Sequence, residues 1–184
     1  MYLYFTIDTY FYGVNNLYLN NKNIIHFLVK AGGLYLAWTL LYHLFIEPDM
    51  RTDSMLILNL IFFADRILHI FNYEVFSSST MIGITGTSGL IISPVCDGLD
   101  LFVLFSIFIV SFPGKAVHKL FFITTGILII HVLNILRIVT LALIENHYPN
   151  ALAFNHSYTF TLLMYLVIFG MWMVWVRKVK RGES

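Results

Sequence analysis

Cys96, Arg137 and His156 combine the side chains that acyl transfer requires, and each lies near the end of a long apolar segment. A cysteine thiolate is a nucleophile that can attack a peptide carbonyl. An arginine can stabilise the oxyanion of the tetrahedral intermediate, and a histidine can protonate the departing amine. These residue types could together catalyse acyl transfer through an acyl-enzyme, provided that the fold brings the three side chains together.

The surroundings of Cys96 favour a reactive thiol. The run Ser93–Leu99 predicts that a helix begins just after the cysteine, and the unpaired N–H groups and positive dipole end of a helix stabilise a thiolate. Gly98 leaves space beside the thiol, whereas the carboxylates of Asp97 and Asp100 oppose a negative charge there. A lone cysteine in a membrane helix is more often a small packing residue, so its role depends on which side chains surround it.

The composition indicates an integral membrane protein. Of the 184 residues, 59% are hydrophobic and 11% are charged, and the mean hydropathy is +0.79. In average soluble proteins about 45–50% of the residues are hydrophobic and about 25% are charged. The net charge of +1 gives no indication of nucleic-acid binding, and a single cysteine excludes an internal disulfide or a cysteine-rich metal centre. We therefore expect one integral membrane domain over residues 1–184, without a metal or cofactor.

An all-α polytopic fold with about four transmembrane helices is predicted. Crossing a bilayer takes about 20 helical residues, and four apolar stretches qualify or nearly qualify: Ile24–Ile46, Leu99–Phe112, Leu120–Ile144 and Tyr158–Val176. The first begins too late and lacks the cleavage site of a signal peptide.

The distribution of basic residues predicts the orientation. Eight of the eleven lysines and arginines fall on the side that the positive-inside rule assigns to the cytoplasm, with both termini: Lys22, Lys30, Lys115, Lys119, Arg177, Lys178, Lys180 and Arg181. Cys96 and His156 then lie at the outer ends of their spans. Arg137 is only about 10 Å along its helix from Ile144, toward the outer leaflet. The topology thus predicts that three residues far apart in sequence share one depth, facing the exterior.

The segment between the first two spans contains two further elements. In Arg51–Asn72, polar residues recur at intervals of seven, which predicts an amphipathic helix lying in the outer interface; alternatively it spans the membrane with Asp65 and Arg66 paired. Glu74–Val95 predicts a β-hairpin, with its turn at Gly86–Gly89, that leads into the cysteine segment.

The third span has a polar stripe of His131, Asn134 and Arg137, which a bilayer makes costly. Two structural interpretations stay open: Arg137 pairs with Asp100 or Glu145, and His131 makes a hydrogen bond between helices. The alternative to an enzyme is a non-enzymatic assembly subunit or small-solute binder, with Arg137 and His131 lining a polar cavity. A narrower form is a bis-histidine haem anchor that uses His131 with His43 or His69.

The motifs, taken in order, resemble the exosortase/archaeosortase family of membrane cysteine transpeptidases. That family has a cysteine followed by a polar residue and Gly-Leu, then Asn-x-x-Arg on the next helix, then a histidine near the start of the following one. Cys96–Leu99, Asn134–Arg137 and His156 match this pattern, and the resemblance covers about residues 50–176. Asp97 departs from it, since Asn or Ser is common there, and the chain lacks the extra N-terminal spans of the longest members.

The resemblance implies a compact bacterial exosortase-like cysteine protease/transpeptidase of the inner membrane. Its partners would be membrane-anchored secreted proteins with a C-terminal sorting signal, cleaved at the outer face and transferred to a lipid or glycan acceptor or to water. Cys96 would be the nucleophile, Arg137 and His156 would complete the site, and Asn134 would support it. No cofactor or nucleic acid is implied.

Overall fold

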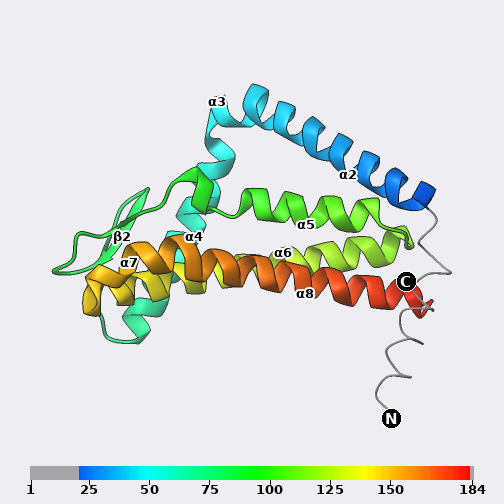
Figure 1. The fold of residues 1–184 in the computed structure, drawn as a ribbon. Helices are drawn as coiled ribbons and strands as arrows, with labels where there is room; N and C mark the ends of the chain where they lie inside the picture. Colours follow the sequence, from blue (N-terminus) through cyan, green and yellow to red (C-terminus); the bar gives the residue numbers. More distant parts are fainter. Residues whose placement is uncertain (1–20, 183–184) are drawn as a thin grey trace, which may run out of the picture.

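The computed structural model describes residues 21–182, which are mostly helical and carry one small sheet (Figure 1). Two short 3₁₀ turns, Pro94–Cys96 and Pro149–Ala151, and two π-helical turns, Tyr42–Ile46 and Asn155–Thr159, interrupt the regular elements. In chain order the α-helices and strands are α2 (Asn21–Leu41), α3 (Glu47–Asp49), α4 (Arg51–Ile70), β1 (Val75–Ser77), β2 (Met81–Ile84), β3 (Leu90–Ile91), α5 (Leu99–Ser111), α6 (Ala116–His147), α7 (Leu152–Phe154) and α8 (Phe160–Lys180).

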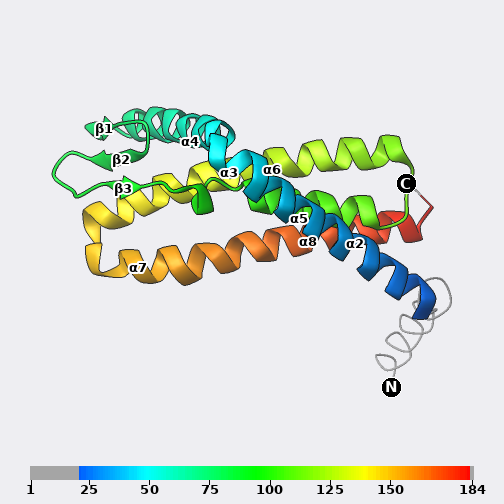
Figure 2. The same ribbon diagram turned by 90° about the horizontal axis from the view of Figure 1, so that it is seen from above.

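Helices α5, α6 and α8 form the centre of the molecule and run side by side (Figures 1 and 2). Gly126 on α6 lets α5 approach closely, because a Cβ at this position would lie 2.1 Å from the ring of Phe105 on α5. Nearer the C-terminus, Trp172 stacks on Phe108 with ring centroids 4.3 Å apart. The buried side chains of this core are Phe102, Phe105, Ile109, Ile130, Met164, Ile168 and Trp175.

Three helical runs are long and apolar enough to cross a membrane: Ile24–Asp49, Ala116–His147 and Pro149–Lys180. The predicted second span forms α5, an apolar helix of only 13 residues, which is about 20 Å long. All four predicted segments are therefore helical, and three have the length of a span. The last run begins earlier than predicted, so His156 lies inside it rather than before it.

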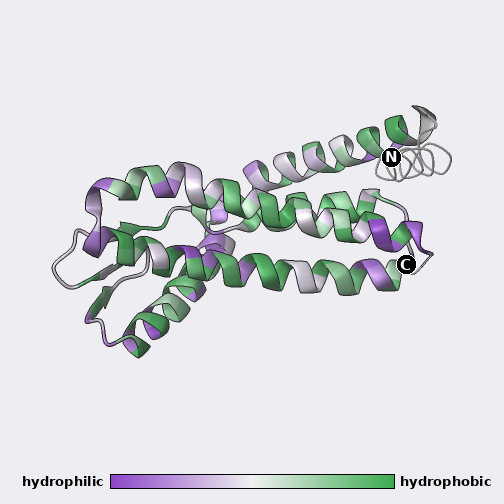
Figure 3. Ribbon diagram, turned by 60° about the horizontal axis from the view of Figure 1, so that its bottom comes forward, coloured by the Kyte–Doolittle hydropathy of each residue, from purple (hydrophilic) through white to green (hydrophobic). Residues whose placement is uncertain are grey.

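Basic side chains gather at the end of the bundle that holds the C-terminal part of α8. Lys30 and Lys119, which come from different helices, both donate to the carbonyl oxygen of Val110, at 3.1 and 3.0 Å. The ammonium of Lys178 lies 5.8 Å from the ring centroid of Phe122. Figure 3 shows hydrophilic residues at this end and again toward the sheet at the other end, while hydrophobic residues predominate along the helices between them. The prediction that both termini are cytoplasmic concerns residues 1–20 and 183–184, which lie outside the described residues.

Helix α4 crosses α6 instead of running along it (Figures 1 and 2). Its buried face, which includes Leu60, Ala64 and Leu68, packs on Ile135 and Ala142 of α6. The pairing of Asp65 with Arg66, which the alternative of a membrane-spanning Arg51–Asn72 requires, is not formed. Asp65 contacts His69 at 3.3 Å and accepts from Ser77, whereas the Arg66 guanidinium lies over the ring of Phe62.

The predicted hairpin is present and carries one more strand. β2 pairs antiparallel with β3, and Met81 lies opposite Ile91. β1 pairs with the other edge of β2, which gives the order β1-β2-β3. The chain leaves β3 through Ser93 and enters the 3₁₀ turn that contains the cysteine. The sheet thus fixes where the cysteine segment approaches the helices.

Candidate active site

Cys96 lies at the end of the 3₁₀ turn Pro94–Cys96, and its N–H donates to the carbonyl oxygen of Ser93 at 2.8 Å. Helix α5 begins three residues later. The Leu99 N–H at its start donates to Asp97 Oδ1 at 2.8 Å. The prediction that the N–H groups of this helix stabilise the thiol is therefore wrong for Leu99, because the carboxylate two residues before it takes that donor.

Asn134 of α6 holds the cysteine turn in place. Its side chain is 1% exposed, and its Nδ2 donates to the backbone oxygen of Cys96 at 2.9 Å. Gly98 adopts a φ of +93°, and a Cβ there would lie 3.1 Å from Asn134 Nδ2. Both the backbone conformation and the close approach require glycine at this position. Asn134 and Gly98 together fix the path of the chain on either side of the thiol.

The three side chains predicted to form a site meet in one place. Cys96 Sγ lies 3.6 Å from His156 Nε2, and Arg137 Nη2 lies 4.0 Å from Sγ and 3.2 Å from Nε2. They come from the turn before α5, from α6 and from the π-helical turn before α8. A guanidinium has only donors, so the Nε2 atom facing it is an acceptor and the imidazole is neutral in this arrangement. A fixed cation and a proton acceptor therefore both adjoin the sulfur.

The alternative partners suggested for Arg137 do not bind it. Asp100 and Glu145 are both described, and neither forms an ion pair with its guanidinium in the part of the chain that the structure covers. The charge of Arg137 is directed instead at Cys96 and His156. This geometry places the cation where an oxyanion next to the sulfur would develop.

Two cavities adjoin the cysteine, and the site side chains separate them. One, of about 50 Å³, lies under β3, and the other, of about 320 Å³, lies between α5 and α8. Cys96, Arg137 and His156 line both. The small cavity is completed by Leu90, Ile91, Ile92, Asn134, Ile138 and Leu141, and the large one by Val95, Gly98, Asp100, Leu101, Ser157, Thr161, Met164 and Tyr165. The three site side chains therefore border one cavity on the side of β3 and another on the side of α8.

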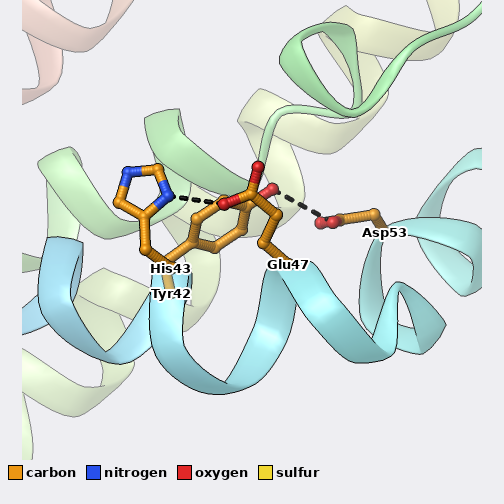
Figure 4. Close-up of polar contacts among 4 residues, drawn as sticks. All are labelled: Tyr42, His43, Glu47 and Asp53. Atoms are coloured by element: carbon orange, nitrogen blue, oxygen red, sulfur yellow. Dashed lines mark hydrogen bonds and ion pairs between the residues drawn. The ribbon is translucent and has the colours of Figure 1, made fainter.

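A buried acidic pair adjoins the site, and the sequence analysis did not identify it. Asp53 of α4 and Asp97 are 2% and 1% exposed, and their side chains interact. Tyr42 donates to Asp53 Oδ2 at 3.0 Å; Figure 4 shows this contact beside the pair of His43 and Glu47. Burial, opposed by the Leu99 N–H and reinforced by Asp53, raises the pKa of Asp97 to about 7. Asp53 Oδ1 and Asp97 Oδ2 have no donor among the described groups, so a proton shared by the two carboxyls would satisfy both.

A sequence signal for Asp53 exists. It precedes Ile57, Leu60 and Ala64 at helical intervals, so it lies on the apolar face of α4, where an acidic residue needs a partner. The pattern identifies Asp53 as a buried carboxyl but not Asp97 as its partner, because no sequence spacing connects α4 with the cysteine turn.

The histidines proposed for haem have separate partners. His131 Nε2 hydrogen-bonds Asn59 Oδ1 at 2.8 Å, as the helix-to-helix interpretation expects, and His131 lines neither cavity at the cysteine. His43 pairs with Glu47, and His69 pairs with Asp65. Across residues 21–182, no group of three or more His, Cys, Asp or Glu side chains is arranged to hold a metal ion.

The fold and this cluster together define a polytopic membrane protein with a cysteine–arginine–histidine site. The sequence profile of the transmembrane exosortase family (Exosortase_EpsH) matches residues 24–177, so the chain belongs to that family. No curated protein and no solved structure matches it significantly. The predicted family is confirmed, and membership supports a membrane transpeptidase-like role toward membrane proteins with sorting signals.

Proposed function

We propose that this protein is a cysteine protease/transpeptidase that cleaves the C-terminal sorting signal of secreted proteins at the outer face of the inner membrane. It then transfers the cleaved protein to a lipid or glycan acceptor, or to water. The observation that carries the proposal is the contact of Cys96 Sγ with both Arg137 and His156, at 4.0 and 3.6 Å. Family membership supplies the substrate class.

In the first half-reaction the Cys96 thiolate attacks the scissile carbonyl carbon, and a carbon–sulfur bond forms. The carbonyl oxygen becomes an oxyanion, which the guanidinium of Arg137 stabilises. The attacking thiolate forms because the thiol proton has moved to His156, whose Nε2 is 3.6 Å from the sulfur. The intermediate collapses with cleavage of the carbon–nitrogen bond, and His156 gives that proton to the leaving amine. A thioester on Cys96 and the C-terminal fragment remain.

In the second half-reaction an acceptor amine or a water molecule attacks the thioester carbonyl. His156, now neutral, takes the proton of the nucleophile, and Arg137 again stabilises the oxyanion. The carbon–sulfur bond breaks, and His156 returns the proton to the sulfur. Throughout, Asn134 holds the backbone of Cys96 so that the sulfur stays between its two partners.

The basic residues near Val110 support the orientation. By the positive-inside rule the bundle end with Lys30, Lys119 and Lys178 is cytoplasmic. The sheet and the cysteine turn lie toward the opposite end of the bundle (Figure 1). The site would then face the exterior, where the sorting signal of a secreted protein emerges.

The test uses a reporter made of a secreted domain followed by the C-terminal signal of a secreted protein from the same cell. We expect Cys96→Ala, Arg137→Ala and His156→Ala each to abolish its cleavage while expression stays normal. His131→Ala is the matched control, because it is on α6 but outside both cavities at the cysteine. Normal cleavage in all three site variants would exclude the proposed mechanism.

A further inference from the structure

The strand that leads into the cysteine turn lies at an edge of the sheet. β3 is last in the order β1-β2-β3, and no further strand of residues 21–182 pairs with it. The chain stays extended beyond β3, since Ser93 has a φ of −95° and a ψ of 163°. The extended segment therefore runs from the hairpin turn directly to the turn that carries Cys96.

The register shows which backbone groups face this edge. Ile92 N–H donates to Thr80 O at 2.8 Å, and Leu90 lies opposite Ile82, so these residues bond toward β2. In an antiparallel ladder, consecutive residues direct their N–H and C=O groups to opposite sides. The N–H and C=O of Ile91 consequently point away from β2, toward the edge. Its side chain is 73% exposed.

The edge and the thiol share a cavity. Ile91 lines the 50 Å³ cavity with Cys96, Arg137 and His156. A chain hydrogen-bonded to Ile91 would thus continue to the sulfur without crossing another element. Ile91 and the 88% exposed Val95 present apolar side chains along this route.

We propose that β3 binds the substrate as an added strand, with the extended segment directly N-terminal to the scissile bond paired to the backbone of Ile91. This rests on the proposed function, and it identifies how that site would hold its substrate. In β-strand addition, main-chain hydrogen bonds supply affinity, and contacts to alternate side chains supply specificity.

The second cavity gives the direction of the bound chain. Ser157, Thr161 and Tyr165 line one face of the helical run that ends in α8, and they span about 12 Å along it, away from the sheet. The apolar span of a sorting signal follows the cleavage site, so it would leave through this cavity into the bundle region. The preceding residues then lie along β3. Both chains run toward Cys96, and the pairing is therefore parallel.

Proline substitution tests the main-chain bond. Ile91→Pro removes the N–H that faces the edge and leaves the ladder to β2 intact. We expect it to slow reporter cleavage about ten- to a hundred-fold at low substrate, because a substrate carbonyl loses its donor. Ile91→Val keeps the N–H and should therefore slow cleavage less than Ile91→Pro does. Ser77→Pro is the matched control, because by the register of β1 its N–H faces the opposite edge of the sheet.

Cleavage by Ile91→Pro at the wild-type rate would overturn strand addition, and so would an equal loss in Ser77→Pro. Cleavage that persists in Cys96→Ala would instead overturn the proposed function itself. Maleimide labelling of Cys96 in the proline variants reports whether the site is folded.

Cross-linking decides the question independently of proline. In the inactive Cys96→Ser background, Ile91→Cys is combined with single cysteines at each of the five reporter residues before the scissile bond. Strand pairing predicts disulfide yields that alternate along the reporter, because side chains of a strand alternate between faces. Equal yields at all five positions, or none at any, would overturn the proposal.

Discussion

Replacing Asn134 by alanine should uncouple the cysteine turn from α6. The wild-type side chain is 1% exposed and donates to the Cys96 carbonyl at 2.9 Å. Leaving a buried carbonyl without its donor costs about 1–3 kcal/mol. If that cost falls on the ordered state of the turn, the ratio of ordered to disordered turn decreases about 5- to 150-fold. Reporter cleavage should decrease by up to that factor.

The assay compares the cleavage rate and the thermal midpoint of Asn134→Ala with those of Asn59→Ala. Asn59 is the matched control, since its amide also joins two elements, α4 and α6, through His131 at 2.8 Å, but it lines neither cavity at the cysteine. We expect Asn59→Ala to lower only the thermal midpoint. An Asn134→Ala variant that cleaves as fast as wild type would refute the positioning role. So would an equal loss of activity in the control.

Three further perturbations test the surroundings of the thiol. An impermeant maleimide should label Cys96 in intact cells, and Arg137→Ala should slow the labelling, because the cation beside the sulfur is lost; no labelling from outside would contradict the orientation. The pKa of Asp97, raised from 3.8 to about 7, means that the folded protein binds this proton more tightly than the unfolded chain. That contribution to stability is complete below pH 4 and lost as the pH rises through 7. Asp97→Asn should therefore flatten the fall in tryptophan-monitored thermal midpoint between pH 5 and 8, and an unchanged slope would exclude the shared proton. Gly98→Ala should cost about 1–2 kcal/mol through its φ of +93° and slow cleavage; wild-type midpoint and rate would contradict the constraint.

The helices and the hairpin could be predicted because their signals are local. Apolar length predicted the helical segments, and the short apolar runs on either side of the Gly86–Gly89 turn predicted β2 and β3. The proximity of Cys96, Arg137 and His156 could be predicted for a different reason. A membrane limits how elements can be arranged, so charge bias and span order place distant residues at one depth. The structure adds their contact distances; their catalytic roles remain a proposal.

Interactions between two elements could not be predicted where no periodicity in the sequence relates the residues of one element to those of the other. The Asp53–Asp97 pair depends on how α4 crosses the cysteine turn, and no periodicity encodes that crossing. The start of the last helical run was misplaced because Pro149 begins it among polar residues that resemble a loop. The expectation that unpaired N–H groups at the start of α5 stabilise the thiol fails at Leu99, because the sequence shows that Asp97 is near but not which way its carboxyl turns.

The most direct test of Cys96 as the nucleophile is to trap the covalent intermediate. Purified protein is mixed with the reporter, quenched in acid, and analysed by mass spectrometry with and without hydroxylamine. The mechanism predicts an adduct of the cleaved reporter on the peptide that contains Cys96, released by hydroxylamine and absent in Cys96→Ala. Cleavage without such an adduct, or an adduct that persists in Cys96→Ala, would contradict it.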